Sequence, residues 1–541
     1  MLKIAKVIAL FKSGSTEEVN NYRPISLLPL FDKIIEKIAH RELYAFIEEH
    51  NILYKKQFGF RRRNSTAHSL IEITEQIKES IDNGKFGCGI FIDLKKAFDT
   101  VNHEILLCKL EHYGVRGNML KWFKSYLTDR KQYVFYNGVS SEVKIITCGV
   151  PQGSVLGPLL FLLYINDLPN ISEKLDFYLF ADDTNIYFES KNLKFLEKTV
   201  NEELKKLSTW LNVNRLALNV SKTNFVIFRS HKKIPDHNVT LLMNKKALQQ
   251  TDHVKYLGVL VDQHLTWKYQ TKNVVLKISR GIGILTKVKP FLTDKLIKNI
   301  YYSLVYSYLA YGVHVWGSAD KKYLEKIITL QNKAVRILSG VQYFQIYGQK
   351  PGPLPASEPL YKKLEILKFK DIFKLNIATF VYAALINKDC PQIFHDWFKY
   401  DHEVHEHATR ASTNVIRENY FDVGHTELRR TLHTKGSKNG YGAKMIQAYG
   451  PIVWNSLPEE LQNAPGICTF KDELKKYMFG QYDETLVNVR IPDTSEHSPD
   501  RYCVINASNN GLKIVLRKLN PDMYCVANSS PDGLKIVLRR V

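Results

Sequence analysis

The chain has 541 residues, of which 45% are hydrophobic and 12% aromatic, so it can bury a large core and is not an intrinsically disordered protein. It carries 76 lysine and arginine residues against 54 aspartate and glutamate residues, a net charge of +22 that favours a polyanionic partner such as nucleic acid. This charge argues against a secreted enzyme for small substrates, and seven cysteines without a CxxC pair predict neither a disulfide framework nor a zinc knuckle.

The first 85 residues show a mixed pattern of strand and helix. The apolar run after Met1 is too short for a signal peptide and reads as a strand. Apolar residues from Phe31 to Ile38 have helical spacing, a basic loop follows at 54–66, and a second apolar stripe at 70–77 predicts another helix.

Residues 86–267 alternate short apolar strands with helices, which predicts an α+β module. The strand candidates are CGIFID, YVFYNG, EVKIITC, DFYLFADDTNIYF, NFVIF and KYLGVLV. The most apolar stretch, which begins at Val155, meets Asn166 and Asp167 well before the roughly 20 residues that a membrane-spanning helix needs. We therefore expect no membrane segment.

Residues 268–345 are predicted to form a basic helical segment, because thirteen lysines and arginines stand against three acids between Lys268 and Arg336. Its last helix is expected to end at Gly340. Three further parts follow: a Pro/Gly-rich linker at 346–359, a helical domain at 360–482, and a tail at 483–541. The tail contains a duplicated 16-residue segment, and each copy resembles a small β-hairpin.

Carboxylates stand at the ends of two predicted strands. Asp93 follows one apolar run, and Asp182 and Asp183 lie in a turn between two others. Each pattern alone is more often structural or solvated, because Asp tolerates turn geometry. A Gly/Pro-rich segment at 149–158 lies between them, where a simple tight turn is the alternative. Taken together, two acid-ended strands and a backbone platform favour a site that binds two metal ions and transfers a phosphoryl group.

In combination these stretches resemble the reverse transcriptases of non-LTR retrotransposons, the jockey-like and related long interspersed elements. The resemblance covers roughly residues 5–340 and, more loosely, the segment 453–479. The matching stretches are NYRPISLLP at 21–29 and QFGFRRRNST at 57–66 for the fingers, FIDLKKAFD, GVPQGSVLGP and FADD for the palm, LNVSKTNFVIF at 218–228, and KYLGVLVD at 255–262 for the primer-grip hairpin. The resemblance implies an α+β right-hand polymerase with fingers at 1–85, palm at 86–267 and thumb at 268–345.

The resemblance also implies roles for individual residues. Asp93 and Asp182 would bind two Mg²⁺ ions, with Mn²⁺ as the alternative, and Asp183 would complete the catalytic metal site by shaping the same turn. Further roles fall to Phe98 beneath the incoming sugar, Gln152 and Gly153 beside nucleotide and template, Arg61 at the triphosphate, and Lys222 at the pyrophosphate. The alternatives are a solvated surface loop for Arg61, a core position for Phe98, and a solvated turn for Lys222.

The implied activity is RNA-directed DNA polymerisation, which extends a DNA 3′-hydroxyl on an RNA template. The expected partners are an RNA template, a DNA primer or target DNA, deoxynucleoside triphosphates and a separate endonuclease, because no endonuclease pattern precedes the first motif. We expect an intracellular protein of the nucleus and cytoplasm. A catalytically silent nucleic-acid-binding remnant is one alternative, and another right-hand polymerase, such as an intron maturase or a telomerase, is a second.

Overall fold

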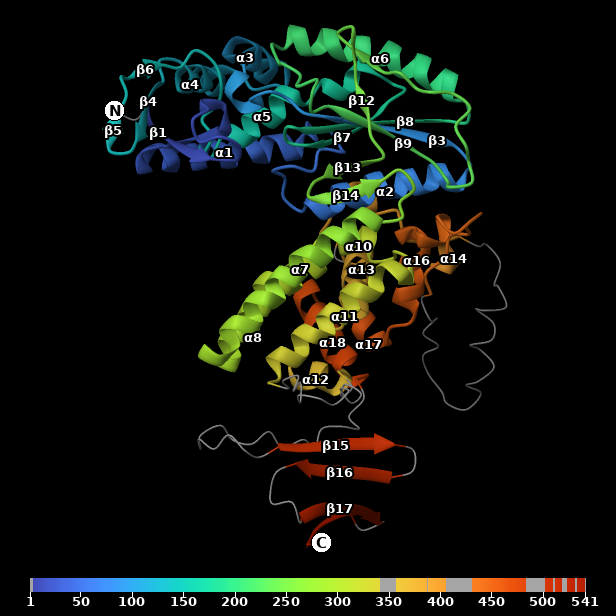
Figure 1. The fold of residues 1–541 in the computed structure, drawn as a ribbon. Helices are drawn as coiled ribbons and strands as arrows, with labels where there is room; N and C mark the ends of the chain where they lie inside the picture. Colours follow the sequence, from blue (N-terminus) through green and yellow to red (C-terminus); the bar gives the residue numbers. More distant parts are fainter. Residues whose placement is uncertain are drawn as a thin grey trace, which may run out of the picture. The chain divides into compact units, whose positions relative to one another are not determined.

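The computed structural model in Figure 1 describes residues 3–340, 357–386, 388–404 and 431–482, together with four strands between 502 and 540. The chain divides into two compact units, one formed by residues 1–343 with 367–478 and one by residues 344–366 with 479–541. Every residue with a predicted site role lies in the first unit.

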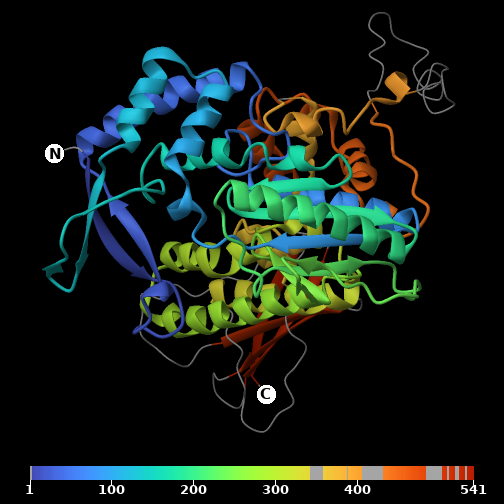
Figure 2. The same ribbon diagram turned by 90° about the horizontal axis from the view of Figure 1, so that it is seen from above.

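A five-stranded sheet occupies the N-terminal part of the first unit. Its strands are β1 (Ile4–Phe11), β2 (Tyr22–Leu27), β4 (Lys131–Tyr136), β5 (Val139–Ser140) and β6 (Lys144–Ile145). Strand β1 pairs antiparallel with β2 and parallel with β4, and β5 and β6 both pair with β4. Figure 2 shows the long strands of this sheet to one side of the central sheet. Strands β4–β6 lie within the range predicted as palm, yet they belong to this N-terminal sheet.

The central sheet has the strand order β12-β9-β3-β8-β7. Its strands are β3 (Phe86–Ile92), β7 (Asp176–Phe180), β8 (Asp183–Ser190), β9 (Asn224–Phe228) and β12 (Gln249–Gln250). Helix α6 (Leu193–Val213) packs on one face and α2 (Thr66–Asp82) on the other, as Figure 1 shows. Because both faces are covered, all seven residues of β3 are buried, which explains its uninterrupted apolar sequence.

The remaining helices of this region are α1 (Leu30–Glu49), α3 (His103–His112), α4 (Gly117–Leu127) and α5 (Gly157–Ile165), with short 3-10 helices η1 (Val19–Asn21), η2 (Ala97–Thr100) and η3 (Leu168–Ile171). Polar side chains start several of them. Ser65 accepts a hydrogen bond from the His68 amide at α2, and Asn192 does the same for Phe195 at α6. Helix α5 lies in the core because it is apolar on every side.

Two hairpins follow, β10 (Leu242–Met243) with β11 (Lys246–Ala247), and β13 (His253–Tyr256) with β14 (Val259–Asp262). The second confirms the hairpin predicted at 255–262. Its Tyr256 hydroxyl lies 2.5 Å from the hydroxyl of Ser69 on α2. The buried carboxylate of Asp262 accepts hydrogen bonds from the amides of Thr266 and Trp267 and so fixes the start of the next helix.

The predicted basic segment is helical. It contains α7 (Lys268–Val288), η4 (Lys289–Phe291), α8 (Asp294–Tyr301), a π-helical turn (Tyr302–Tyr306), α9 (Ser307–Ala310), α10 (Val313–Trp316) and α11 (Lys321–Leu338). Helices α7 and α11 pack against each other. Ile327, Val335 and Leu338 form the buried stripe of α11, and Gly340 follows with a positive φ of 72°, as predicted for the end of this helix.

A C-terminal helical segment packs against α2, on the side away from the central sheet. Its elements are α13 (Phe369–Leu385), η6 (Gln392–Phe394), α14 (Asp401–Val404), η7 (Gly442–Lys444), α16 (Ile446–Asn455), α17 (Glu459–Gln462) and α18 (Ile467–Gly480). The Asp82 carboxylate at the end of α2 accepts hydrogen bonds from the amides of Asn439 and Gly442, and Glu75 accepts one from Ile446. These contacts join the segment closely to the helix behind the central sheet.

The second unit contains α12 (Glu358–Lys363) and two hairpins, β15 (Tyr502–Ser508) with β16 (Gly511–Arg517), and β17 (Met523–Ser530) with β18 (Gly533–Arg540). Both predicted tail hairpins are confirmed. Most of the predicted linker at 346–359 and the start of the tail lie outside the described residues. Throughout the described residues, no helix combines the length and hydrophobicity needed to cross a bilayer.

Candidate active site

Three carboxylates gather at one end of the central strands. Asp183 is the first residue of β8, and Asp182 precedes it in the turn from β7. The register between β3 and β8 pairs Ile92 with Thr184, so Asp93, the next residue after β3, lies beside Asp183. The structure thus brings Asp93 together with Asp182 and Asp183, which follow it by 89 and 90 residues in the sequence.

The charges of these acids reinforce one another. Shielding from water by the surrounding protein, followed by the negative charges of Asp182 and Asp93, raises the pKa of Asp183 to about 6. The pKa of Asp182 is also raised, first by the same shielding and then by Asp93, although both side chains still reach solvent. Such an excess of negative charge favours the binding of a cation.

The donor chemistry of the cluster fits Mg²⁺. This ion is a hard cation that usually takes one or two carboxylates and completes its octahedron with water and substrate phosphate oxygens. Over the described residues, no group of three or more His, Cys, Asp or Glu side chains is arranged to hold a metal by itself. Asp93, Asp182 and Asp183 supply carboxylates of the kind that Mg²⁺ takes when a substrate provides part of its coordination.

Asn219 orients Asp93. Its side-chain amide donates a 2.8 Å hydrogen bond to Oδ2 of Asp93, and its backbone amide donates one of 2.8 Å to the Asp93 carbonyl. Lys222 lies exposed on the same turn, and its backbone amide donates to the Asn219 carbonyl. The sequence analysis selected the lysine of this stretch and missed the asparagine, whose short polar side chain next to the apolar β9 was the available signal.

The QFGF segment supports the acidic turn. Ala181 has a left-handed backbone with φ of 56°, which is unusual for a residue with a Cβ. The side-chain oxygen of the buried Gln57 accepts hydrogen bonds from the amides of Ala181 (3.2 Å) and Gly59 (3.0 Å). A Cβ on Gly59 would lie 2.4 Å from the Ala181 nitrogen, so only glycine allows this approach. Gln57 is a second positioning residue that the sequence analysis missed.

The Gly/Pro-rich loop is built directly on the segment that follows Asp93. The Gln152 side-chain amide donates a 3.0 Å hydrogen bond to Oδ1 of Asp99, and the Val150 amide donates one to the Phe98 carbonyl. Gly153 has φ of 112°, and a Cβ there would lie 2.7 Å from the Ser26 carbonyl oxygen. Gln152 and Gly153 are thereby held between β2 and the turn after β3.

Phe98 lies half-buried between this loop and the core. Its ring stacks on Phe161 of α5 with 4.5 Å between centroids, and the ring of Phe60 meets it edge-on at 6.4 Å. One side of the ring therefore packs in the core while part of it remains accessible. Both predicted interpretations, a wall for the sugar and a core position, are compatible with this placement.

Arg61 is bound to neighbouring residues, and it is not one of the two cations whose charges act on Asp182. The Arg61 guanidinium donates to Oε1 of Glu48 and to the Tyr54 carbonyl, both at 3.2 Å, and its side chain is 18% exposed. By contrast, the positive charges of Arg23 and Lys12 act on Asp182 and partly offset the rise in its pKa. Both stand exposed at the end of the β1–β2 hairpin and make no hydrogen bond or close ion pair through their side chains with any described residue. The sequence analysis did not assign them a role.

The family follows from a comparison with known proteins. A family model described as reverse transcriptase (RNA-dependent DNA polymerase) matches residues 12–261. These residues are a reverse transcriptase domain. All the site residues discussed above lie in it, and the match confirms the predicted reverse transcriptase domain. The mixture of helices and sheets agrees with the predicted α+β fold class. The predicted limits of fingers, palm and thumb stay predictions.

Relatives of the reverse transcriptase domain come from mobile elements. The probable RNA-directed DNA polymerase from transposon X-element of Drosophila melanogaster is 29% identical over 352 residues, and the RNA-directed DNA polymerase from mobile element jockey of the same species is 31% identical over 356 residues. Each alignment covers 63% of this chain and 38% of the relative. The chain therefore spans well under half the length of these relatives.

Other matches extend further along the chain. A retrovirus-related Pol polyprotein from the type-1 retrotransposable element R1 of Bradysia coprophila is 26% identical over 500 residues, which cover 87% of this chain and 49% of that protein. Among solved structures, telomerase from Candida tropicalis with a fragment of telomeric RNA has a TM-score of 0.35 and 10% identity, covering 73% of this chain and 64% of that one.

Proposed function

We propose that this chain is the RNA-directed DNA polymerase of a non-LTR retrotransposon and extends a DNA 3′-hydroxyl on an RNA template. The observation that carries the proposal is the cluster of Asp93, Asp182 and Asp183 at one end of the central sheet of a reverse transcriptase domain. A purely structural role does not account for three mutually repelling carboxylates that reach solvent.

Asp93 and Asp182 would hold two Mg²⁺ ions, with Mn²⁺ as the alternative, and Asp183 adds negative charge beside them. When bound, the ions lower the pKa of the attacking hydroxyl and neutralise the leaving pyrophosphate. The protein prepares this site before any ion arrives. Asn219 fixes the rotamer of Asp93, and Gln57 holds the turn that carries Asp182.

The triphosphate of the incoming nucleotide would meet Arg23 and Lys12. The positive charges of both act on Asp182, and neither side chain is committed to a close partner among the described residues, so both are available for phosphate oxygens. Arg61, which the sequence selected for this task, is held against α1 by Glu48 and acts on the site through the loop it stabilises. Lys222 remains available to neutralise the pyrophosphate from the turn that holds Asp93.

Phe98, Gln152 and Gly153 would form the floor beneath the nucleotide. The Phe98 ring is braced by Phe161, so it resists displacement by a sugar carrying a 2′-hydroxyl. Hydrogen bonds to Asp99 and Ser26 anchor the loop that carries Gln152 and Gly153. They would keep these two residues in fixed positions beside the nucleotide and the template.

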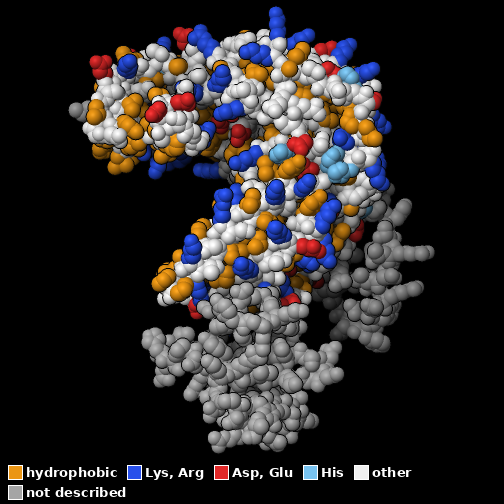
Figure 3. All heavy atoms as spheres, in the orientation of Figure 1, with side chains coloured by type: hydrophobic (Ala, Val, Ile, Leu, Met, Phe, Trp, Pro, Cys, Tyr) orange, Lys and Arg blue, Asp and Glu red, His pale blue; other side chains and the backbone are white. Residues whose placement is uncertain are grey.

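Helix α7 would bind the backbone of the template and primer. Lys272, Arg280 and Lys287 are exposed, and their spacing places them on one side of the helix. On the face shown in Figure 3, lysine and arginine side chains spread over this helix and along the hollow above it. Contacts of this kind neutralise phosphates and carry no base information, so they suit an enzyme that copies any sequence.

The proposed reaction takes place where target DNA is available, so we propose a nuclear site of action after synthesis in the cytoplasm. The test is extension of a labelled DNA primer on an RNA template by the purified chain with Mg²⁺ and deoxynucleotides. Template-directed extension supports the proposal. Tight binding of the RNA–DNA duplex without any extension would instead identify a silent nucleic-acid-binding remnant.

A further inference from the structure

The first turns of helix α1 expose apolar side chains and bury acidic ones. Phe31 and Ile34 on its first turns are 70% and 46% exposed, whereas Asp32 and Glu36, one turn apart, are 6% and 0% exposed. Acidic side chains are almost never fully buried unless they have partners. The buried side of this helix must therefore contain groups that satisfy both acids.

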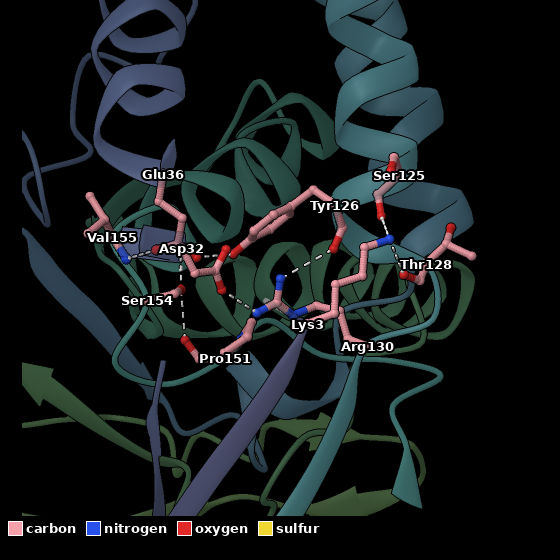
Figure 4. A network of polar contacts seen from close by, with 11 residues as sticks. Lys3, Asp32, Glu36, Ser125, Tyr126, Thr128, Arg130, Pro151, Ser154 and Val155 are labelled. Carbon is pink, nitrogen blue, oxygen red and sulfur yellow. Dashed lines mark hydrogen bonds and ion pairs between the residues drawn. The ribbon is translucent and has the colours of Figure 1, made fainter. Parts of the chain in front are cut away.

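Those groups come from α4 and from the residues just after it, as Figure 4 shows. Arg130 donates a 3.0 Å hydrogen bond to Oδ2 of Asp32, and the Tyr126 hydroxyl donates one of 2.5 Å to Oε1 of Glu36. The Arg130 guanidinium also lies over the Tyr126 ring, 4.7 Å from its centroid. A buried ion pair of this kind contributes little net stability, because the loss of hydration offsets the attraction. The role of this ion pair is to fix the position of α1 relative to the segment after α4.

One contact of the network leaves the helices and reaches the nucleotide side of the site. The Val155 amide donates a 2.6 Å hydrogen bond to Oε2 of Glu36. Val155 follows Gln152 and Gly153 in the Gly/Pro-rich loop, whose near side is anchored by Asp99 and by the hydrogen bond from the Ser26 amide to the Gln152 carbonyl. Glu36 is the anchor on the far side of that loop.

We propose that Glu36 is a positioning residue for nucleotide binding, which acts through the Val155 amide to hold Gln152 and Gly153 at their working distance from the acidic cluster. The inference rests on the proposed polymerase function. Asp32 and Arg130 join the start of α1 to the segment after α4. The Oε2 atom of Glu36 holds the loop, while its Oε1 atom separately accepts the Tyr126 hydroxyl. Without Glu36 the loop keeps its turn but loses its fixed position, so the nucleotide is bound in a wider range of poses.

The test uses three substitutions of Glu36 and one control in the full chain. Glu36→Leu removes both hydrogen bonds. Glu36→Asp keeps the acid but shortens its reach by one methylene. Glu36→Gln keeps an oxygen for Val155 and an amide for the Tyr126 hydroxyl. The control, Tyr126→Phe, removes a hydrogen bond to Glu36 but leaves the bond to Val155 in place.

We expect Glu36→Leu to raise the KM for deoxynucleotides about tenfold and to change kcat by less than about threefold, because the loss falls on nucleotide binding. Glu36→Asp should give a smaller rise, and Glu36→Gln a KM close to that of the original chain. Tyr126→Phe should lower the melting temperature and leave KM unchanged. Hydrogen exchange at the Val155 amide should accelerate in Glu36→Leu and Glu36→Asp but not in Tyr126→Phe.

A KM that stays unchanged in Glu36→Leu and Glu36→Asp, or one that rises equally in Tyr126→Phe, overturns the positioning role and leaves the network merely structural. If the unsubstituted chain binds nucleic acid but does not extend a primer, the proposed function fails instead. Exchange at the Val155 amide and equilibrium binding of a fluorescent deoxynucleotide then decide the role of Glu36: unchanged values in Glu36→Asp refute it, and faster exchange with weaker binding supports it.

Discussion

The side-chain amide of Asn219 donates a 2.8 Å hydrogen bond to the carboxylate of Asp93. The turn before β9 thus determines the orientation of Asp93 at the end of β3, although the two segments are more than a hundred residues apart in the sequence. An amide donor stabilises the ionised carboxylate and leaves its second oxygen free for a cation.

Asn219→Ala should therefore lower kcat for primer extension about tenfold, because Asp93 loses its fixed rotamer while all three acids remain. Ser221→Ala is the matched control, since among the described residues its hydroxyl donates a hydrogen bond only to the side-chain oxygen of Asn219. Steady-state kinetics of both variants on an RNA template provide the measurement. Equal activity of Asn219→Ala and the original chain would show that Asp93 does not need this support.

Arg23→Gln should raise the KM for deoxynucleotides more than Arg61→Gln does. The charge of Arg23 acts on Asp182, and Arg23 has no close partner among the described residues, whereas Arg61 is engaged by Glu48 and the Tyr54 carbonyl. We expect an increase of about tenfold for Arg23→Gln, the size of one lost charge-assisted hydrogen bond. Arg61→Gln should mainly lower the melting temperature. Arg41→Gln, which removes an exposed ion pair with Glu42, is the control. The reverse order of the two KM values would restore the triphosphate role to Arg61.

Phe98→Val should raise ribonucleotide incorporation strongly and leave deoxynucleotide incorporation largely intact. A smaller side chain leaves room for a 2′-hydroxyl where the braced ring now excludes it. The measurement is the ratio of the two incorporation rates, taken together with the melting temperature. An unchanged ratio with a lower melting temperature would identify Phe98 as a core residue only, because a truncated core ring creates a cavity.

The raised pKa of Asp183 predicts a specific pH dependence of stability in the absence of metal. The folded protein takes up a proton at about pH 6 and the unfolded chain nearer the ordinary value of 3.8, so ionised Asp183 destabilises the fold above about pH 6. The destabilisation decreases as the pH falls from about 6 toward 3.8. In EDTA, Asp183→Asn should thus melt higher than the original chain at pH 7.5, and the difference should disappear near pH 4. The effect is moderated by solvent, since the side chain is exposed. A variant that melts lower at pH 7.5 would contradict the repulsion.

Much of the site was predictable because its acids follow strands that are buried on both faces. Uninterrupted apolar runs indicate such strands, and an acid that directly follows one must lie where the strand leaves the sheet. Asp93 and the Asp182–Asp183 turn could therefore be placed together without coordinates. Helices α6 and α11 could also be predicted from the sequence, since each has a continuous apolar stripe on one face.

The rest depends on contacts that no local pattern reveals. Periodicity suggests that the apolar stripe of α1 is its buried side, yet Asp32 and Glu36 face inward because their partners, Arg130 and Tyr126, arrive about 90 residues later. Strand β4 pairs in parallel with β1, from which it is separated by 127 residues, and this pairing moves part of the predicted palm into the N-terminal sheet. The effect of the Arg23 charge on Asp182 is likewise a property of the folded chain.

The most direct test of the central claim compares the original chain with Asp93→Asn and Asp182→Asn in extension of a DNA primer on an RNA template with Mg²⁺. Asparagine keeps the shape of each side chain and removes the charge that holds the ions, so extension should fall by at least about a thousandfold in either variant while binding of the RNA–DNA duplex persists. Retention of template-directed synthesis in both variants would contradict the assignment of these carboxylates as the catalytic metal site.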